Sequence, residues 1–283
     1  MSDISDISKA LNFGKDYLSR SNVNDAELSA EILLAEALGL NRQSLYSHFE
    51  DKLTEVQQEL YKEYISRRSN HEPLQYLLGY AYFRGLKIAV GHGVLIPRPE
   101  TEQLVEVAIK NLKNNSNKIL DLCTGSGCIA CSFANEFSDV KIYGTDISEE
   151  ALAYAKMNIK KHDFEEKITL VQCNMADEIF DNNFDLIISN PPYVPTDVYK
   201  NLDREVIDYE PKLALEAGND GASLLDEIIA TAKDKLKIDG IVALEFHEDK
   251  LDLAKSKFET AGFNDCKIYK DLAGKDRILI AKK

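Results

Sequence analysis

Residues 190 to 193 read Asn-Pro-Pro-Tyr and directly follow the apolar run Phe184–Ser189. Neither proline has an N–H for a sheet ladder, and each restricts the residue before it, so a strand must end here and the chain must turn. The turn exposes the amide of Asn190, the carbonyl of Pro191 and the ring of Tyr193. We therefore predict a site for a planar, nitrogen-bearing group.

A second chemistry-bearing segment, Asp121-Leu-Cys-Thr-Gly-Ser-Gly127, lies between a predicted strand and a helix. Gly125 and Gly127 let the backbone approach a ligand closely, and the first N–H groups of the helix point at it. Asp146 follows the next predicted strand, about 20 residues on, where a carboxylate accepts hydrogen bonds from ribose hydroxyls. A tight strand-to-helix turn explains the glycines alone, but the added acid favours a nucleoside cofactor.

The glycines and the later acid do not identify the cofactor, because dinucleotide-binding folds use them too. Asp121 is the residue that discriminates between the two cofactor classes. A carboxylate at this strand end suits the ammonium and sulfonium of S-adenosylmethionine, whereas a dinucleotide has no cation there. Capping of the turn is the alternative role for Asp121. After the third predicted strand, Asn174 is a polar contact and Met175 a soft apolar platform for adenine, with a plain core position as the alternative for Met175.

The elements that must position these residues alternate between strands and helices from Pro97 onward. Strands are predicted at Lys118–Leu122, Val140–Thr145, Ile168–Gln172, Phe184–Ser189, Ile241–Glu245, Lys267–Tyr269 and Ile278–Ala281. Helices are predicted near 99–113, 127–137, 148–162, 222–236 and 250–261. This alternation predicts an α/β fold with a doubly wound, mostly parallel, seven-stranded sheet. The connection before the last strand is too short for a crossover helix, so the last strand should run antiparallel.

The segment before this sheet reads differently. Residues 1–78 predict a helical bundle: Leu28, Ile32, Ala35 and Leu38 form one apolar series that ends at Gly39, and Thr54–Gln57 has the form of a helix cap. Residues 79–96 predict a β-hairpin linker, because Arg84-Gly85 separates two short strand-forming runs. Residues 97–283 are the predicted catalytic domain.

Composition limits the partners. The 48 acidic residues outnumber the 34 basic ones and give a formal net charge of −14, which disfavours non-specific binding to nucleic-acid phosphates. No apolar run approaches membrane-spanning length. The five cysteines are odd in number, and three crowd one segment, so a reducing, cytoplasmic setting is expected rather than a disulfide framework. Cys128 and Cys131 lie in a predicted helix without a second pair, and we expect small buried residues rather than a metal site.

Asn190-Pro-Pro-Tyr193 is similar to the motif of methyltransferases that act on amide or exocyclic amino nitrogens. Such a nitrogen is a poor nucleophile because its lone pair is delocalised. Acceptance of its two N–H bonds by the Asn190 side-chain oxygen and the Pro191 carbonyl would orient it and favour the charge that develops on it. Asn190 and Pro191 are therefore the predicted catalytic residues, and Tyr193 is expected to pack against the planar group. No tuned general base is required.

More narrowly, the chain resembles the release factor glutamine methyltransferases. The residues that carry this resemblance are His71–Gly79, Val94–Glu102, the glycine turn, Ile188–Val194, Tyr209–Leu215 with Gly218–Gly221, and Asp271–Arg277. The resemblance implies a Rossmann-like methyltransferase domain, S-adenosylmethionine as donor, and transfer to the side-chain nitrogen of the glutamine in the Gly-Gly-Gln loop of bacterial peptide chain release factors. The N-terminal helices would grip the release factor, and the enzyme is expected to be a monomer without a nucleic-acid substrate.

Carried over by motif position, the resemblance assigns two groups of residues. Those expected to hold the glutamine are Asn190, Pro191, Pro192 and Tyr193. Those expected at the cofactor are Asp121, Cys123, Thr124, Gly125, Ser126, Gly127, Asp146, Asn174, Met175 and Asn190. Two positions depart from the family: Cys123 stands where glycine is usual, and Glu245-Phe246-His247 lacks the glycine that often follows the glutamate.

Two rival functions remain open. Adenine-N6 methylation of nucleic acid uses the same four-residue motif, but it predicts a basic face that this composition disfavours. The second rival function is that of a non-catalytic adaptor that has kept the cofactor fold.

Two further segments have alternative roles. For Arg98 and Glu100, bracing of the active-site lid or substrate backbone and a local ion pair at a helix start are equal alternatives. The acidic stretch Asp203–Glu210 is expected to be a solvated face, with a substrate-facing loop as the alternative.

Overall fold

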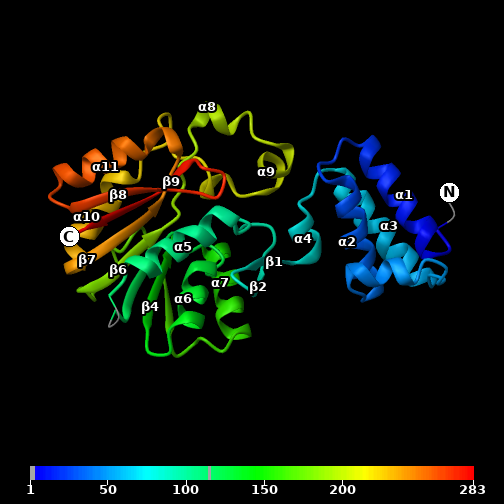
Figure 1. Cartoon of the computed structure of the whole chain (residues 1–283), viewed down its shortest axis with the longest axis horizontal. Coiled ribbons are helices and arrows are strands. Elements are labelled where there is room, and N and C mark those ends of the chain that lie inside the picture. The colour runs from blue at the N-terminus through cyan, green and yellow to red at the C-terminus, as the bar shows by residue number, and fades with distance from the viewer. Residues whose placement is uncertain (1–3, 114–115) are drawn as a thin grey trace. The chain divides into compact units, whose positions relative to one another are not determined.

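The computed structural model describes residues 4–113 and 116–283, so residues 1–3 of the predicted helical domain lie outside it. The chain forms two compact units (Figure 1). One unit consists of Met1–Gly79 together with Asp203–Tyr209, and the other of Tyr80–Leu202 together with Glu210–Lys283. Each is described by itself below.

The first unit is helical. Its elements are α1 (Ile7–Arg20), α2 (Ala26–Leu38), the 3₁₀ turn η1 (Arg42–Ser47), α3 (Glu55–Ser69), α4 (Leu74–Leu78) and α9 (Arg204–Tyr209). Two sequence predictions are confirmed here: α2 ends at Gly39, whose φ of 65° needs no Cβ, and Thr54 forms a capping box with Gln57 at the start of α3. Leu18, Leu33, Leu34, Tyr61 and Ile65 are among the residues of its apolar core.

Helix α9 belongs to this unit although its sequence neighbours belong to the other. Its Glu205 accepts a hydrogen bond of 2.7 Å from Arg68, and Arg68 is buried, where it also donates to the carbonyl of Glu72 at 2.9 Å. A buried guanidinium requires such partners. The prediction of a solvated face is therefore wrong for Glu205.

The second unit begins with the predicted hairpin. Strands β1 (Tyr80–Phe83) and β2 (Leu86–Ala89) pair antiparallel. The two residues between them, Arg84 and Gly85, have φ angles of 46° and 80°. Positive φ at both central positions is the geometry that matches the twist of a two-residue hairpin.

The seven-stranded sheet of the second unit has the order β5-β4-β3-β6-β7-β9-β8. Its strands are β3 (Lys118–Leu122), β4 (Lys141–Asp146), β5 (Ile168–Gln172), β6 (Phe184–Ser189), β7 (Leu236–Glu245), β8 (Asn264–Lys270) and β9 (Asp276–Lys282). The first five pair in parallel, and β9 is antiparallel to both β7 and β8. The predicted fold, including the antiparallel last strand, is confirmed. Strand β7 starts earlier than predicted, because a register shift near Phe184 lets Leu236 join the ladder.

Helices cover both faces of this sheet (Figure 1). The long ones are α5 (Pro99–Asn111), α6 (Cys128–Glu136), α7 (Glu149–Lys161), α10 (Leu225–Lys235) and α11 (Leu251–Thr260), and short turns are α8 (Thr196–Tyr199), η2 (Lys212–Ala214) and η3 (Glu248–Lys250). One apolar core joins the sheet to α10 and α11, with Phe184, Ile228 and Phe258 fully buried. Among the described residues, no helix is both long enough and apolar enough to cross a membrane.

Candidate active site

The register of the parallel strands places four polar positions in one row. Leu122 of β3 pairs with Thr145 of β4 and with Ser189 of β6, and Ser189 pairs with Leu244 of β7. The next residues along these strands are Cys123, Asp146, Asn190 and Glu245. Ligands of open α/β sheets bind at this carboxyl edge, so the row marks the place to look for a site.

A cavity lies at this edge, within the second unit. Of the predicted site residues, its lining includes Cys123, Thr124, Gly125, Ser126, Asp146, Asn174, Met175, Asn190 and Pro192. Asp121, Gly127, Pro191 and Tyr193 are absent from that lining. The fold therefore brings the glycine turn, the adenine-side residues and the Asn-Pro-Pro turn to one cavity, from three separate strand ends.

Asp121 is fully buried and does not line the cavity. Its Oδ2 accepts a hydrogen bond of 2.5 Å from Thr124, but its Oδ1 has no hydrogen-bond partner among the described residues. Burial raises the pKa of Asp121 to about 7, and the nearby charge of Asp146 acts in the same direction. The bond from Thr124 fits the alternative role of Asp121 in capping the turn, and its contact with a cationic group of the cofactor stays a prediction.

Asp146 organises the turn as well as facing the cavity. Its Oδ2 accepts from the backbone N–H of Gly125 at 2.9 Å, and its Oδ1 accepts from that of Ser148 at 2.9 Å. Burial raises the pKa of Asp146, while these N–H groups oppose the shift. A carboxylate has about four acceptor sites, so two remain for ligand hydroxyls.

Cys123 has a φ of 57°, which explains why a glycine is natural at this position. Its side chain packs against the core of the sheet and also lines the cavity. Burial raises the pKa of its thiol to about 12, so it stays protonated at neutral pH. Cys128 and Cys131 are buried in α6, as expected from the sequence, and burial raises the pKa of both thiols.

Met175 and Asn174 follow β5 on the other side of Asp146. Met175 is buried, lines the cavity and also belongs to the apolar core, so both of its predicted roles are compatible with its position. The amide of Asn174 donates to Glu227 at 2.8 Å. Their contacts with adenine stay predictions.

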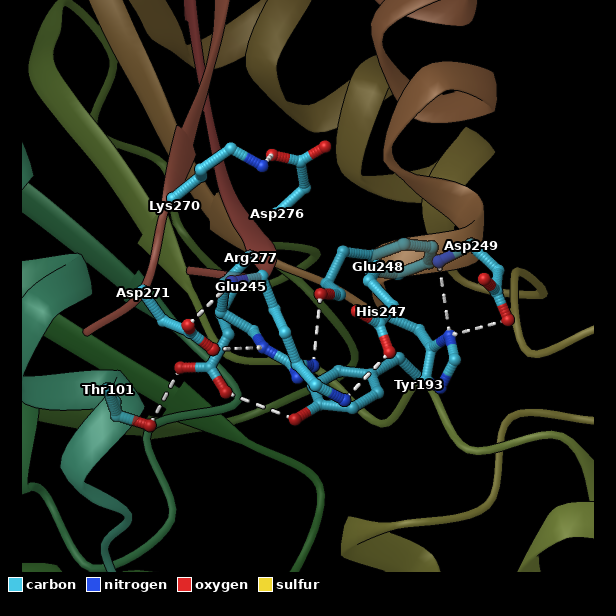
Figure 2. A network of polar contacts seen from close by, with 12 residues as sticks. Thr101, Tyr193, Glu245, His247, Glu248, Asp249, Lys270, Asp271, Asp276 and Arg277 are labelled. Atoms are coloured by element: carbon cyan, nitrogen blue, oxygen red, sulfur yellow. Dashed lines mark hydrogen bonds and ion pairs between the residues drawn. The ribbon is translucent and has the colours of Figure 1, made fainter. Parts of the chain in front are cut away.

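Asn190 is held by helix α5. Its Nδ2 donates to Oγ1 of Thr101 at 2.9 Å, and Thr101 donates to Oε2 of the buried Glu245 at 2.7 Å. Figure 2 shows Thr101 and Tyr193 reaching Glu245 from opposite sides, with Arg277 nearby. The Oδ1 of Asn190 makes no hydrogen bond with any described residue.

Tyr193 is turned toward this network. Its hydroxyl donates to Oε1 of Glu245 at 3.1 Å, and its ring lies 6.0 Å from that of Phe246. Burial raises the pKa of this phenol, with the charge of Glu245 adding to the shift. Packing of Tyr193 against a substrate stays a prediction.

Arg98 pairs with Glu210 rather than with Glu100. Glu210 also accepts from the backbone N–H of Ile96 at 3.1 Å and is buried, so the prediction of a solvated face is wrong for Glu210 as well. The residues after Glu210 close one side of the cavity through Pro211, Leu213 and Ala214. Arg98 and Glu210 thus connect the segment before α5 to this wall.

Comparison with known proteins assigns the family. Residues 9–79 match the model of the PrmC N-terminal domain, and residues 100–218 match that of the methyltransferase small domain. The release factor glutamine methyltransferase of Thermodesulfovibrio yellowstonii is 38% identical, over 97% of this chain and 98% of its own length. That of Geobacter sulfurreducens is 36% identical, over 96% of this chain and 95% of its own length.

The chain belongs to the release factor glutamine methyltransferase family. Solved structures support the fold. A methyltransferase from Pyrococcus furiosus superposes with a TM-score of 0.54 at 23% identity, over 77% of this chain and 98% of that chain. The human methyltransferase 10 domain containing protein gives 0.51 at 17% identity, over 70% and 90%.

Two residues were not assigned a role from sequence: Thr101, which lines the cavity, and Glu245, which does not. Thr101 stands at the third position of α5, inside the motif Pro97-Arg-Pro-Glu-Thr. Glu245 is the last residue of the apolar strand β7. A carboxylate at the end of a buried strand is the signal that could have drawn attention to Glu245. The link between the two residues spans 144 positions and is visible only in the fold.

Proposed function

We propose that this chain transfers a methyl group from S-adenosylmethionine to the side-chain nitrogen of the glutamine in the Gly-Gly-Gln motif of bacterial peptide chain release factors. The near-full-length similarity to release factor glutamine methyltransferases supports the reaction and the acceptor. One observation about Asn190 carries the proposal. Asn190 lines the cavity, in the same row of strand ends as Asp146, and its Oδ1 has no hydrogen-bond partner among the described residues.

The residues around the glycine turn fit the donor. The orphaned Oδ1 of Asp121 suits its cationic groups, and the remaining acceptor sites of Asp146 suit ribose hydroxyls. Gly125, with a φ of 56°, keeps the cavity wall free of a side chain. A Cβ on Gly127, whose φ is 75°, would lie only 3.1 Å from that of Ala155, so this glycine lets the start of α6 approach α7. When bound, S-adenosylmethionine supplies the electrophilic methyl group.

The Asn-Pro-Pro turn holds the acceptor. Oδ1 of Asn190 and the carbonyl of Pro191 accept hydrogen bonds from the two N–H bonds of the glutamine carboxamide, which orients a nitrogen that is otherwise a weak nucleophile. The same two oxygens stabilise the positive charge that develops on the nitrogen. As the nitrogen gains the methyl group, the S–C bond of the donor breaks and S-adenosylhomocysteine is left. The nitrogen then releases one of its protons to solvent water, so no base is needed at the start.

The remaining assignments extend this proposal. The helical unit grips the release factor, Pro192 and Tyr193 bound the glutamine side chain, and the enzyme acts as a monomer in the reducing cytoplasm. The five cysteines, none of them in a disulfide, are compatible with such a compartment.

Mass spectrometry tests the proposal. Purified chain is incubated with methyl-labelled S-adenosylmethionine and a full-length release factor, and a release factor whose Gly-Gly-Gln glutamine is replaced by alanine serves as control. We expect one labelled methyl on that glutamine and none on the control. Equal labelling of both proteins, or no labelling by a chain that binds the donor, would contradict the proposal.

A further inference from the structure

Asn190 can present either end of its amide to the cavity, and only one end serves the proposed reaction. With Oδ1 facing outward, it accepts a substrate N–H, whereas with Nδ2 facing outward it would set a donor against a donor. Rotation of the amide by a half turn exchanges the two ends at little cost in shape. Something in the protein must therefore select the orientation.

We propose that Thr101 and Glu245 are positioning residues that fix the direction of the Asn190 amide, so that its oxygen rather than its NH₂ group meets the acceptor nitrogen. This inference rests on the proposed function. Neither residue needs to touch the substrate.

The Thr101 hydroxyl has a single proton, and the direction of that proton determines which end of the Asn190 amide pairs with Thr101. Thr101 is 3% exposed and lies 2.7 Å from Oε2 of Glu245 and 2.9 Å from Nδ2 of Asn190. An ionised carboxylate can only accept, so the hydroxyl proton points at Glu245. The hydroxyl oxygen is then left as an acceptor, and the only end of the Asn190 amide that can pair with it is Nδ2.

Hydrogen bonds to both oxygens hold the carboxylate of Glu245 in one orientation. It is 1% exposed, and its other oxygen, Oε1, accepts from the hydroxyl of Tyr193 at 3.1 Å. Each of its two oxygens thus accepts a hydrogen bond from a neighbouring hydroxyl, as Figure 2 shows. An uncompensated buried carboxylate is costly, so these two donors stabilise the arrangement that orients Asn190.

Protonation of Glu245 would remove the selection. A carboxylic acid can donate to Thr101, which frees the threonine proton for Oδ1 of Asn190 and permits the reversed amide. Burial raises the pKa of Glu245 to about 7 against the opposing hydrogen bonds of Thr101 and Tyr193; the charge of Arg277 lowers this pKa, and that of Glu100 raises it. Asp271 lies 3.7 Å from Arg277 and partly offsets its charge. The amide should therefore be ordered above neutral pH and mixed below it.

Kinetics with saturating donor test the chain of contacts. Thr101→Val removes the hydroxyl at constant shape and should lower kcat about tenfold, the usual effect of one hydrogen bond, with donor affinity unchanged. Thr101→Ser restores the hydroxyl and should recover most of that loss. Thr169→Val, at an exposed strand position, is the matched control and should change nothing.

A double-mutant cycle separates positioning from mere support of the fold. If Thr101 acts through Asn190, Thr101→Val should cause no further loss in the Asn190→Ala background. The same tenfold loss in both backgrounds would overturn the proposal.

The pH profile tests the role of Glu245. We expect kcat of the native enzyme to rise between pH 6 and pH 8, and Glu245→Gln, whose amide can pair with Thr101 in either direction, should flatten this rise. A rise that persists unchanged in this variant would also overturn the proposal.

Nuclear magnetic resonance gives a readout that needs no turnover. The side-chain NH₂ signals of Asn190, assigned by their loss in Asn190→Ala, should report a hydrogen-bonded proton that Thr101→Val abolishes. If the Asn190 NH₂ signals of Thr101→Val are the same as those of the native protein, the positioning role is refuted even where methyl transfer is observed. Conversely, the expected signals in a chain that fails to methylate a release factor would contradict the proposed function and leave the positioning contacts intact.

Discussion

At the scale of single residues, the site depends on carboxyl groups whose burial sets their protonation. Asp121 is fully buried with one oxygen unpaired, and burial raises its pKa to about 7. A cation placed beside it favours the ionised form and lowers that pKa. On the proposed assignment of Asp121 to the donor's cationic groups, donor binding and loss of the Asp121 proton are linked.

This linkage predicts the pH dependence of donor binding. Below pH 7 the free protein holds a proton on Asp121 that binding must expel, so affinity for S-adenosylmethionine should rise roughly tenfold between pH 5.5 and pH 7. Titration calorimetry at both pH values measures it. Asp121→Asn, which cannot ionise, should bind more weakly and without this rise. A native affinity that falls over the same interval would show that Asp121 does not serve the cation.

At the scale of elements, the parallel pairing of β3, β4, β5 and β6 brings residues that are far apart in the sequence to one edge of the sheet. The turns after β3, β4 and β6 could be predicted to meet because apolar strands and their polar ends are local signals. The stretch Asp203–Glu210 could not be interpreted correctly, because the partners of the half-buried Glu205 and the buried Glu210 are Arg68, Ile96 and Arg98, which are more than a hundred positions away. An acidic run carries no local signal for such partners.

The attachment of α9 leads to a stability prediction. Glu205→Ala leaves the buried guanidinium of Arg68 without its carboxylate, and we expect the free energy of unfolding to fall by about 1–3 kcal/mol. Asp208→Ala on the same helix breaks only an exposed pair with Arg204 and should cost no more than about 0.5 kcal/mol. Urea unfolding followed by circular dichroism compares the two variants. Equal losses would mean that Arg68 does not depend on Glu205.

At the scale of the whole molecule, charge separates this chain from enzymes that share its four-residue motif and act on nucleic acid. A net charge of −14 opposes the counterion-driven binding on which such proteins depend. The fold itself does not discriminate, since the methyltransferase sheet hosts several acceptors. Composition and the family together point to a protein acceptor.

The corresponding prediction concerns duplex DNA. Fluorescence anisotropy with a labelled duplex at about 0.1 M salt should show no binding at micromolar protein concentration, because a net charge of −14 opposes binding to the phosphates. Salt-dependent binding at these concentrations would revive adenine methylation as the function. Labelled release factor is the positive control in the same assay.

The account depends most on Asn190 acting on the acceptor and not on the donor. The decisive measurement is a paired determination on Asn190→Ala, with kcat for release factor methylation and calorimetric Kd for S-adenosylmethionine, beside Asn182→Ala in an exposed loop as control. We predict a loss in kcat of about a hundredfold to a thousandfold, since the variant removes one of the two acceptors of the reacting amide, with Kd changed by less than about twofold. A large loss of donor affinity with kcat retained at saturation would contradict the account.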